Sequence, residues 1–151
     1  MGTASAHTEA GREHAARIGR HEDWRSGHFA ERTAAMPTVT YDGRSFMLDG
    51  RRLWLVSGSI PYARISRELW AERIHLAKLC GLNTIETPIF WNRHEPRAGK
   101  LDFTGENDLR HFVRLVQQAG LHCVLRIGPF VGAGWEMGGL PAWLADLKDV
   151  K

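Results

Sequence analysis

Hydrophobic residues recur at every second position, at 39 and 41 and again at 46 and 48, on either side of a short polar segment. That segment contains Asp42-Gly43, a dipeptide that favours the tight turn of a β-hairpin because both residues tolerate a positive φ. The pattern predicts a hairpin, which begins shortly after residue 37.

Three longer apolar runs follow, at 52–58, 83–90 and 121–127. The first comes directly after a second turn signal, Asp49-Gly50. Continuous apolar runs of this length are typical of strands that are buried on both faces, as in parallel sheets. We therefore expect three buried strands.

Two segments between these runs repeat apolar residues at helical spacing. The first, 67–80, follows the capping residue Ser66 and ends before Gly81; the second, 106–119, ends before Gly120. The apolar stripes consist of Trp70, Ile74 and Ala77 in the first segment and of Leu109, Phe112, Val113 and Val116 in the second. Both segments are predicted to be helices, and Pro141 is expected to open another over 142–147.

The order is therefore a hairpin, then β-α-β-α-β, then the start of a helix. A doubly wound sheet shares this order, but it usually carries a glycine-rich phosphate loop, G-x-G-x-x-G, after its first strand. In this chain residues 57–61 read Ser-Gly-Ser-Ile-Pro instead. The pattern favours an α/β fold, a partial (β/α)8 TIM barrel made of the first three βα units. Because eight units need about 250 residues, we expect residues 37–151 to be the N-terminal part of such a barrel.

Residues 1–36 differ in composition from the rest and are expected to be a disordered or mis-started tail. Residues 1–35 are rich in Ala, Gly, Arg, Glu and His, too polar to offset the entropy lost on ordering, and Met36 is a plausible start. Histidines recur every seven residues, at His7, His14, His21 and His28. On a helix they would lie about 10 Å apart, too far to share one zinc ion, so the spacing is read as coincidence.

Composition narrows the classes of partner. The net charge of +3 comes without a polybasic run, so no nucleic-acid partner is expected. The apolar runs are too short to cross a bilayer and none forms a signal peptide, so no membrane partner is expected either. The two cysteines, Cys80 and Cys123, are predicted to be buried free thiols in a reducing compartment, which favours a cytoplasmic location.

The loop after the third run, 128–144, is the richest in candidate chemistry. It holds five glycines, two prolines, Trp135, Trp143 and the carboxylate of Glu136. An indole offers a flat apolar face and a carboxylate accepts hydroxyl hydrogen bonds, a combination that suits a sugar. For Trp143, packing of the loop on the rim of the fold is an equally good interpretation.

Acid–base chemistry on a glycoside requires two carboxyl groups that flank the scissile bond. Spacing alone offers Glu95 and Glu136, with His94 as a possible proton-transfer group. The alternatives are structural: Glu95 bonded to backbone amides or to Arg93, Glu136 in a similar role, and His94 as a hydrogen-bonded core histidine. The sequence contains no metal-ligand cluster, nucleophile elbow or phosphate loop, so no cofactor is predicted.

Four blocks together carry a resemblance to a known family. They are Ser-Gly-Ser-Ile-Pro-Tyr-Ala-Arg-Ile at 57–65, Gly-Leu-Asn-Thr-Ile-Glu-Thr at 81–87, Trp-Asn-Arg-His-Glu-Pro at 91–96, and the glycine-rich loop at 128–144. In this order and spacing they resemble glycoside hydrolase family 35, the β-galactosidase family. The resemblance implies a (β/α)8 barrel in a retaining, exo-acting hydrolase that removes terminal β-linked galactose or a related sugar through a glycosyl-enzyme intermediate.

The resemblance also implies where the site residues lie. Residues that match the family or occupy its loops, and are expected to bind the carbohydrate substrate, are Tyr62, Trp91, Asn92, Glu95, Ala133, Trp135 and Glu136. The family's acid/base is a glutamate in an Asn-Glu motif after the fourth strand, and its nucleophile lies near the seventh. Since the chain has no Asn-Glu dipeptide, both catalytic glutamates, with the rest of the barrel, are expected beyond Lys151.

Two positions depart from the family pattern. Pro88 stands where a galactose-contacting tyrosine is usual, and Gly134 stands where a sugar-binding glutamate is usual. Loss of a charge-assisted hydrogen bond costs about 1.5–3 kcal/mol, so the preferred sugar is open. The alternative function is a non-catalytic truncated remnant or a weak carbohydrate-binding module. A phosphate-handling barrel is disfavoured because its phosphate loops come late in the fold.

Overall fold

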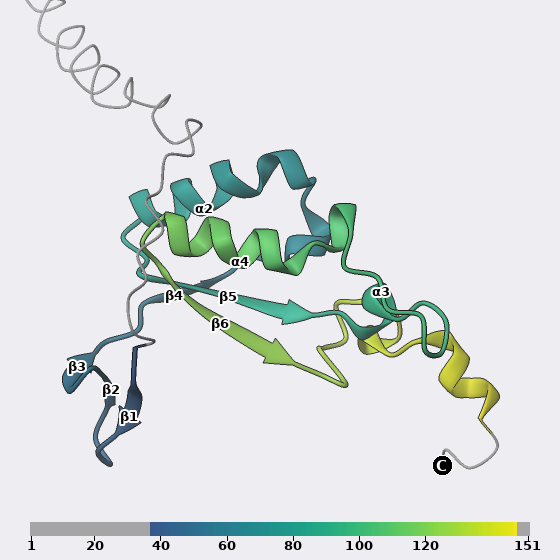
Figure 1. The fold of residues 1–151 in the computed structure, drawn as a ribbon, viewed down its shortest axis with the longest axis horizontal. Coiled ribbons are helices and arrows are strands. Elements are labelled where there is room, and N and C mark those ends of the chain that lie inside the picture. Colours follow the sequence, from purple (N-terminus) through teal and green to yellow (C-terminus); the bar gives the residue numbers. More distant parts are fainter. Residues whose placement is uncertain (1–36, 148–151) are drawn as a thin grey trace, which may run out of the picture. The chain divides into compact units, whose positions relative to one another are not determined.

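The computed structural model describes residues 37–147, an α/β arrangement with two three-stranded sheets (Figure 1). The predicted tail and its four histidines fall on residues 1–36, which lie outside the described residues, as do residues 148–151. Within the described part, no helix is long and apolar enough to cross a membrane.

The first sheet is antiparallel and confirms the predicted hairpin. Strands β1 (Val39–Tyr41) and β2 (Phe46–Leu48) pair around the first Asp-Gly turn, and the second turn adds β3 (Arg51–Leu53) in the order β1-β2-β3. Asp49, in the second turn, has a φ of 50°, in the left-handed region that such turns use.

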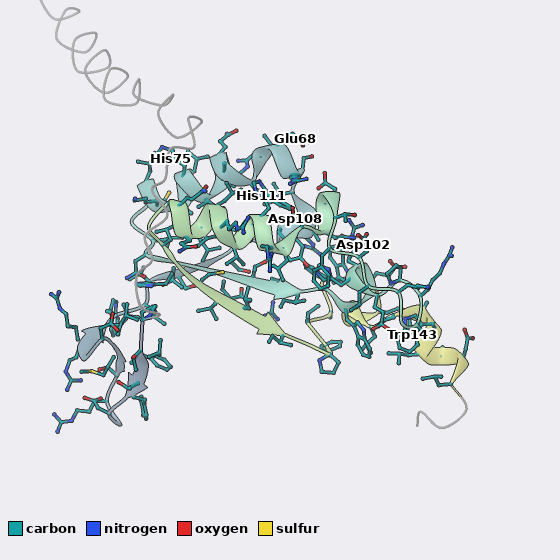
Figure 2. The ribbon with its side chains drawn as sticks, viewed as in Figure 1. Glu68, His75, Asp102, Asp108, His111 and Trp143 are labelled. Atoms are coloured by element: carbon teal, nitrogen blue, oxygen red, sulfur yellow. The ribbon has the colours of Figure 1, made fainter. Side chains whose placement is uncertain are left out.

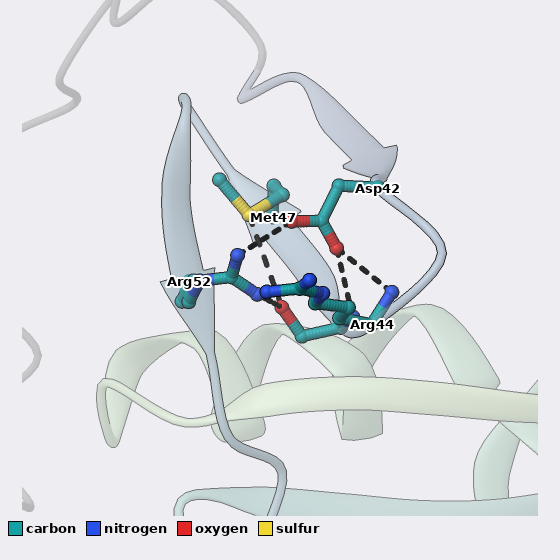
Figure 3. Close-up of polar contacts among 5 residues, drawn as sticks. Asp42, Arg44, Met47 and Arg52 are labelled. Atoms are coloured by element: carbon teal, nitrogen blue, oxygen red, sulfur yellow. Dashed lines mark hydrogen bonds and ion pairs between the residues drawn. The ribbon is translucent and has the colours of Figure 1, made fainter.

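The carboxylate of Asp42 closes the first turn, as Figure 3 shows. Its Oδ1 accepts hydrogen bonds from the amides of Ser45 (2.9 Å) and Arg44 (3.0 Å), and its Oδ2 pairs with Arg52 at 2.8 Å. These donors, the Ser45 amide above all, stabilise the ionised form and lower the pKa of Asp42. The turn is thus fixed by one side chain as well as by the backbone.

The prediction of a single strand over 52–58 was wrong. β3 ends at Leu53, and β4 (Ser57–Ser59) belongs to the second sheet. Between them the side chain of Asn83 accepts a hydrogen bond from the amide of Val56 (2.8 Å) and donates one to the carbonyl of Trp54 (2.6 Å). Because these backbone groups bond the side chain of Asn83, they form no hydrogen bonds to a neighbouring strand. Trp54, which lies in this interruption, is 82% exposed.

The second sheet is parallel, with the order β4-β5-β6. Its longer strands, β5 (Thr84–Ile89) and β6 (His122–Ile127), occur where the second and third apolar runs predicted them and pair from Thr84↔His122 to Ile89↔Ile127. The helices α2 (Trp70–Leu79) and α4 (Leu109–Gln118) connect the strands and lie side by side over one face of the sheet (Figure 1).

Both helices begin later than the sequence predicted. A 3-10 turn (Arg67–Leu69) precedes α2, and Ser66 makes no side-chain cap. α4 begins after Asp108, whose carboxylate accepts a hydrogen bond from the amide of His111 at 2.9 Å, a cap that the pattern did not single out. At the far end of α2, Gly81 has a φ of 88° and ends the helix as predicted.

Several short helical segments complete the chain. The helix α3 (Trp91–His94) follows β5 and was not predicted. The other 3-10 turns are Tyr62–Arg64, Gly105–Asn107, Glu136–Gly139 and Ala142–Asp146, of which the last agrees with the helical start expected after Pro141.

The core lies between the two helices and the parallel sheet. Its fully buried side chains include Tyr62, Trp70, Ile74, Ile85, Phe112 and Val116. The indole Nε1 of Trp70 donates to the carbonyls of Tyr62 (3.0 Å) and Ile65 (2.9 Å), so the largest core residue leaves no polar atom unpaired.

The strand β6 is not buried as predicted. It is the last strand of the parallel sheet in the described part of the chain and has a neighbour on one side only. Its Val124, Leu125 and Ile127 are therefore exposed, the last by 76%. Of the two cysteines predicted to be buried, Cys80 is exposed and Cys123 is half-buried; both are free.

The packing of α2 predicts a contrast between two aliphatic residues of the same helix. Ile74 is 1% exposed and Leu79 is 63% exposed. Ile74→Ala is expected to lower the free energy of unfolding by about 2–5 kcal/mol, because it leaves a cavity in the core. Leu79→Ala removes the same number of carbon atoms from the surface and should change it by less than about 0.5 kcal/mol. Urea denaturation monitored by circular dichroism measures both; equal losses would contradict this packing.

Candidate functional site

A cavity of about 240 Å³ lies where the three parallel strands end. It is lined by Pro61 and Arg64 after β4, by Pro88 and Phe90 at the end of β5, and by Arg126, Val131, Gly132, Gly134 and Trp135 from β6 and its loop. The carboxyl ends of parallel strands meet at one edge of a sheet, which is where α/β proteins place their sites. In Figure 1 the arrowheads of β5 and β6 point toward this edge.

Trp135, in the wall of the cavity, contacts three other residues. Its ring packs on Phe90, with the centroids 4.0 Å apart, and its Nε1 donates to Oδ1 of Asn92 at 3.0 Å. The guanidinium carbon of Arg64 lies 5.5 Å from the ring centroid, a cation–π geometry. The half-buried indole is thus held from three directions, and two predicted site residues, Trp135 and Asn92, are brought together.

Glu95 has the structural role that was the alternative to catalysis. Its Oε2 accepts from Nε1 of Trp91 at 2.6 Å and its Oε1 from the amide of Gly99 at 2.7 Å. These donors, the Trp91 indole first, stabilise the carboxylate and lower the pKa of Glu95. Arg93, the other partner considered, bonds Asn107 instead.

Trp143 packs on the same segment rather than on the cavity. Its Nε1 donates to the carbonyl of Glu95 at 2.9 Å, and its ring meets Trp91 edge-on, with the centroids 5.7 Å apart. Figure 2 labels Trp143 near the C-terminal end of the described chain. Packing of the loop, one of the two interpretations offered for this tryptophan, is therefore the one the structure supports.

Tyr62 is not among the residues that line the cavity, and its predicted contact with substrate stays a prediction. It is fully buried, and its hydroxyl lies 2.5 Å from Nε2 of His94, while Nδ1 of His94 bonds the carbonyl of Asp102 at 2.9 Å. Burial raises the pKa of Tyr62 to about 12. Since both ring nitrogens of His94 are engaged, this histidine is the hydrogen-bonded core residue and not a free proton-transfer group.

The remaining predicted residues do not line the cavity. Ala133 is exposed between two lining glycines, and Glu136 is exposed at the start of its 3-10 turn. Trp91 and Glu95 face each other in and after α3. Their predicted contacts with substrate stay predictions.

Arg126 is a lining residue that sequence reasoning did not select. Its Nε pairs with Oε1 of Glu86 at 2.8 Å, and its Nη1 donates to the carbonyl of Val131 at 2.6 Å. The pairing of β5 with β6 sets Pro88 opposite Arg126 and places Glu86 two residues away on the same face. The signal that could have identified Arg126 is its charge within a largely apolar predicted strand, 121–127.

The glycines of the 128–144 loop are needed for its course. Gly138 has a φ of 65°, and a Cβ atom at this position would overlap the ring of Phe130. Gly134 is different: it has no left-handed backbone, yet it lines the cavity together with Pro88. The two departures from the family pattern therefore fall on the same cavity.

Within residues 37–147, no group of three or more His, Cys, Asp or Glu side chains could hold a metal ion. The polar side-chain groups that line the cavity are the guanidinium groups of Arg64 and Arg126 and the indole N–H of Trp135. Such groups bind hydroxyl and anionic oxygens.

Comparisons with known proteins agree with these features. Residues 45–151 match the profile of the family described as Glycosyl hydrolases family 35. Beta-galactosidase 11 of Arabidopsis thaliana is 50% identical over 112 residues, which are 74% of this chain and 13% of that protein. Beta-galactosidase 8 of the same plant is 48% identical over 118 residues, 78% of this chain and 14% of that protein. The chain thus spans only a small part of these relatives, and it belongs to glycosyl hydrolase family 35.

Proposed function

We propose that residues 37–151 form the sugar-binding side of a barrel glycosidase that acts on terminal β-linked galactose or a related sugar. The observation that carries this proposal is the cavity at the carboxyl ends of three parallel strands, with Trp135 fixed on its wall. The relatives are named beta-galactosidases, which supports the substrate class.

The size and the lining of the cavity fit a single sugar unit. Its volume of about 240 Å³ lies below the roughly 300–1,000 Å³ of pockets that take drug-sized ligands. The apolar wall of Trp135 and Phe90 suits the C–H face of a pyranose, and the Arg64 guanidinium offers donors for ring hydroxyls. A pocket for one unit is what an exo-acting glycosidase requires.

The partial (β/α)8 barrel is part of this proposal. The order β4-α2-β5-α4-β6 repeats the strand–helix unit of such barrels, and both helices lie on one face of the sheet. The exposed side chains of β6 support the idea that further strands pair beyond it.

Catalysis is proposed to depend on carboxylates other than those described. A retaining mechanism needs a protonated acid and a nucleophilic carboxylate on either side of the bond. Glu95, with both oxygens bonded and its pKa lowered, is ionised and a poor proton donor. Glu136 does not line the cavity, and the sequence has no Asn-Glu dipeptide. A non-catalytic sugar-binding module is the alternative, favoured by Gly134 in place of the usual glutamate.

Sugar binding is expected to depend on one tryptophan and not on another. Trp135→Ala should weaken binding of methyl β-galactoside by about tenfold, because it removes the stacking face. Trp54→Ala, at an 82% exposed position that does not line the cavity, is the matched control and should leave the affinity unchanged. Isothermal titration calorimetry measures both, and equal effects would contradict the assignment of the cavity.

The 151-residue chain is expected to hydrolyse no aryl β-galactoside, because neither Glu95 nor Glu136 lines the cavity where a double displacement would need its acid and its nucleophile. Release of the aryl chromophore by the purified chain tests this. Turnover that persists through further purification and is abolished by Glu95→Gln or Glu136→Gln would contradict it.

The structural role of Glu95 predicts a pH dependence. Its folded pKa lies below the ordinary value of 4.5, so its stabilising effect is full above that value and is lost as pH falls through the folded pKa. Glu95→Gln should therefore lower the melting temperature at pH 7, and the difference from the unaltered chain should shrink below about pH 4. Glu136→Gln, at an exposed site, is the control and should show no such trend. Thermal melts from pH 3 to pH 7 measure the effect, and a constant difference across this range would contradict the role.

A further inference from the structure

We propose that the cavity favours a sugar that carries a carboxylate, a uronic acid glycoside, over neutral galactose. The inference rests on the proposed function, in which this cavity is the sugar subsite. Its starting point is the charge of the lining: of the nine residues that line the cavity, two are arginines and none is acidic.

Arg64 is the cation that such a ligand would meet. Its guanidinium is exposed, donates through Nη2 to the carbonyl of Gly134, and lies over the Trp135 ring. Within residues 37–147 it takes part in none of the ion pairs. The loop contacts therefore fix its position at the cavity without neutralising its charge.

The other arginine of the lining, Arg126, already has an acidic partner, so no acidic group of the lining balances the charge of Arg64. Glu86 pairs with Arg126 at 2.8 Å, so these two groups cancel. Glu95 is bonded to Trp91 and the Gly99 amide, and Glu136 is not part of the lining. One positive charge remains at the cavity, that of Arg64.

Gly134 explains why the charge is unpaired. Its backbone is open to any residue, and a Cβ atom built there would lie 3.8 Å from Nη2 of Arg64, an ordinary contact. An acidic side chain at 134 would thus sit beside the guanidinium and balance it, as well as repel an anionic ligand. With glycine at 134, the space beside the guanidinium of Arg64 is open and its positive charge is unpaired. A sugar carboxylate can occupy that space and pair with that charge.

The chemistry of the pair fits a carboxylate. A guanidinium presents a planar fork of N–H donors that matches two carboxylate oxygens, and the indole can hold the sugar ring beside it. Because Arg64 is exposed, solvent screens the interaction, and the gain should be on the order of tenfold in affinity rather than a thousandfold.

Calorimetric titration of the protein with methyl β-D-galacturonide and with methyl β-D-galactoside tests the inference. The uronide is expected to bind on the order of tenfold more tightly in dilute buffer, with the advantage shrinking as salt is added. Gly134→Glu should abolish the preference, because the new carboxylate pairs with Arg64. Gly134→Gln adds the same bulk without charge and should keep the ratio of the two affinities.

Each other outcome overturns the inference in a distinct way. If galactoside binds as tightly as uronide, the cavity is a sugar site without acidic preference, and the proposed function stands. If neither sugar binds, the proposed function fails too. If sodium acetate displaces the uronide at equal concentration, the site is a general anion site. If Gly134→Glu and Gly134→Gln retain the preference equally, Arg64 is not its source.

Discussion

The burial of Tyr62 between the helices and the strand ends is the interaction on which the arrangement of the site depends. Its ring centroid lies 5.7 Å from Phe112, 5.8 Å from Phe90 and 6.1 Å from Trp70, and its hydroxyl bonds His94. Aromatic pairs of this kind contribute about 0.5–1.5 kcal/mol each beyond the area they bury. Tyr62 thereby ties α2, α4 and the segment after β5 to the turn after β4.

That turn carries two of the cavity's lining residues. Pro61 and Arg64 lie within two positions of Tyr62, so the buried ring fixes the course of the backbone that carries both. Tyr62 therefore helps to position Arg64, a residue that lines the cavity.

The loops after β5 and β6 are joined by indole N–H groups. Trp135 donates to Asn92, and Trp143 donates to the carbonyl of Glu95, across 43 and 48 positions of sequence. Trp91 bonds the carboxylate of Glu95 within the first of these loops. Ordering the loops before a ligand arrives reduces the entropy lost on binding. The tryptophans that suggest sugar binding therefore divide into one that lines the cavity, Trp135, and two that hold its surroundings.

The sequence by itself determined the elements with local causes. The Asp-Gly turn set the hairpin, the apolar runs set β5 and β6, and helical periodicity with Gly81 set α2, because each depends on residues close together in the chain. The family blocks also singled out Trp135 and Asn92.

Only the tertiary structure decided that the predicted strand over 52–58 is interrupted, since the side chain that bonds its backbone is that of Asn83, nearly thirty positions away. It also decided which residues become neighbours. Parallel pairing places Arg126 opposite Pro88, and Tyr62 and His94 are buried while Arg64 lines the cavity. Periodicity assigns a residue to a face, but its partner across that face is fixed by register and packing between distant segments.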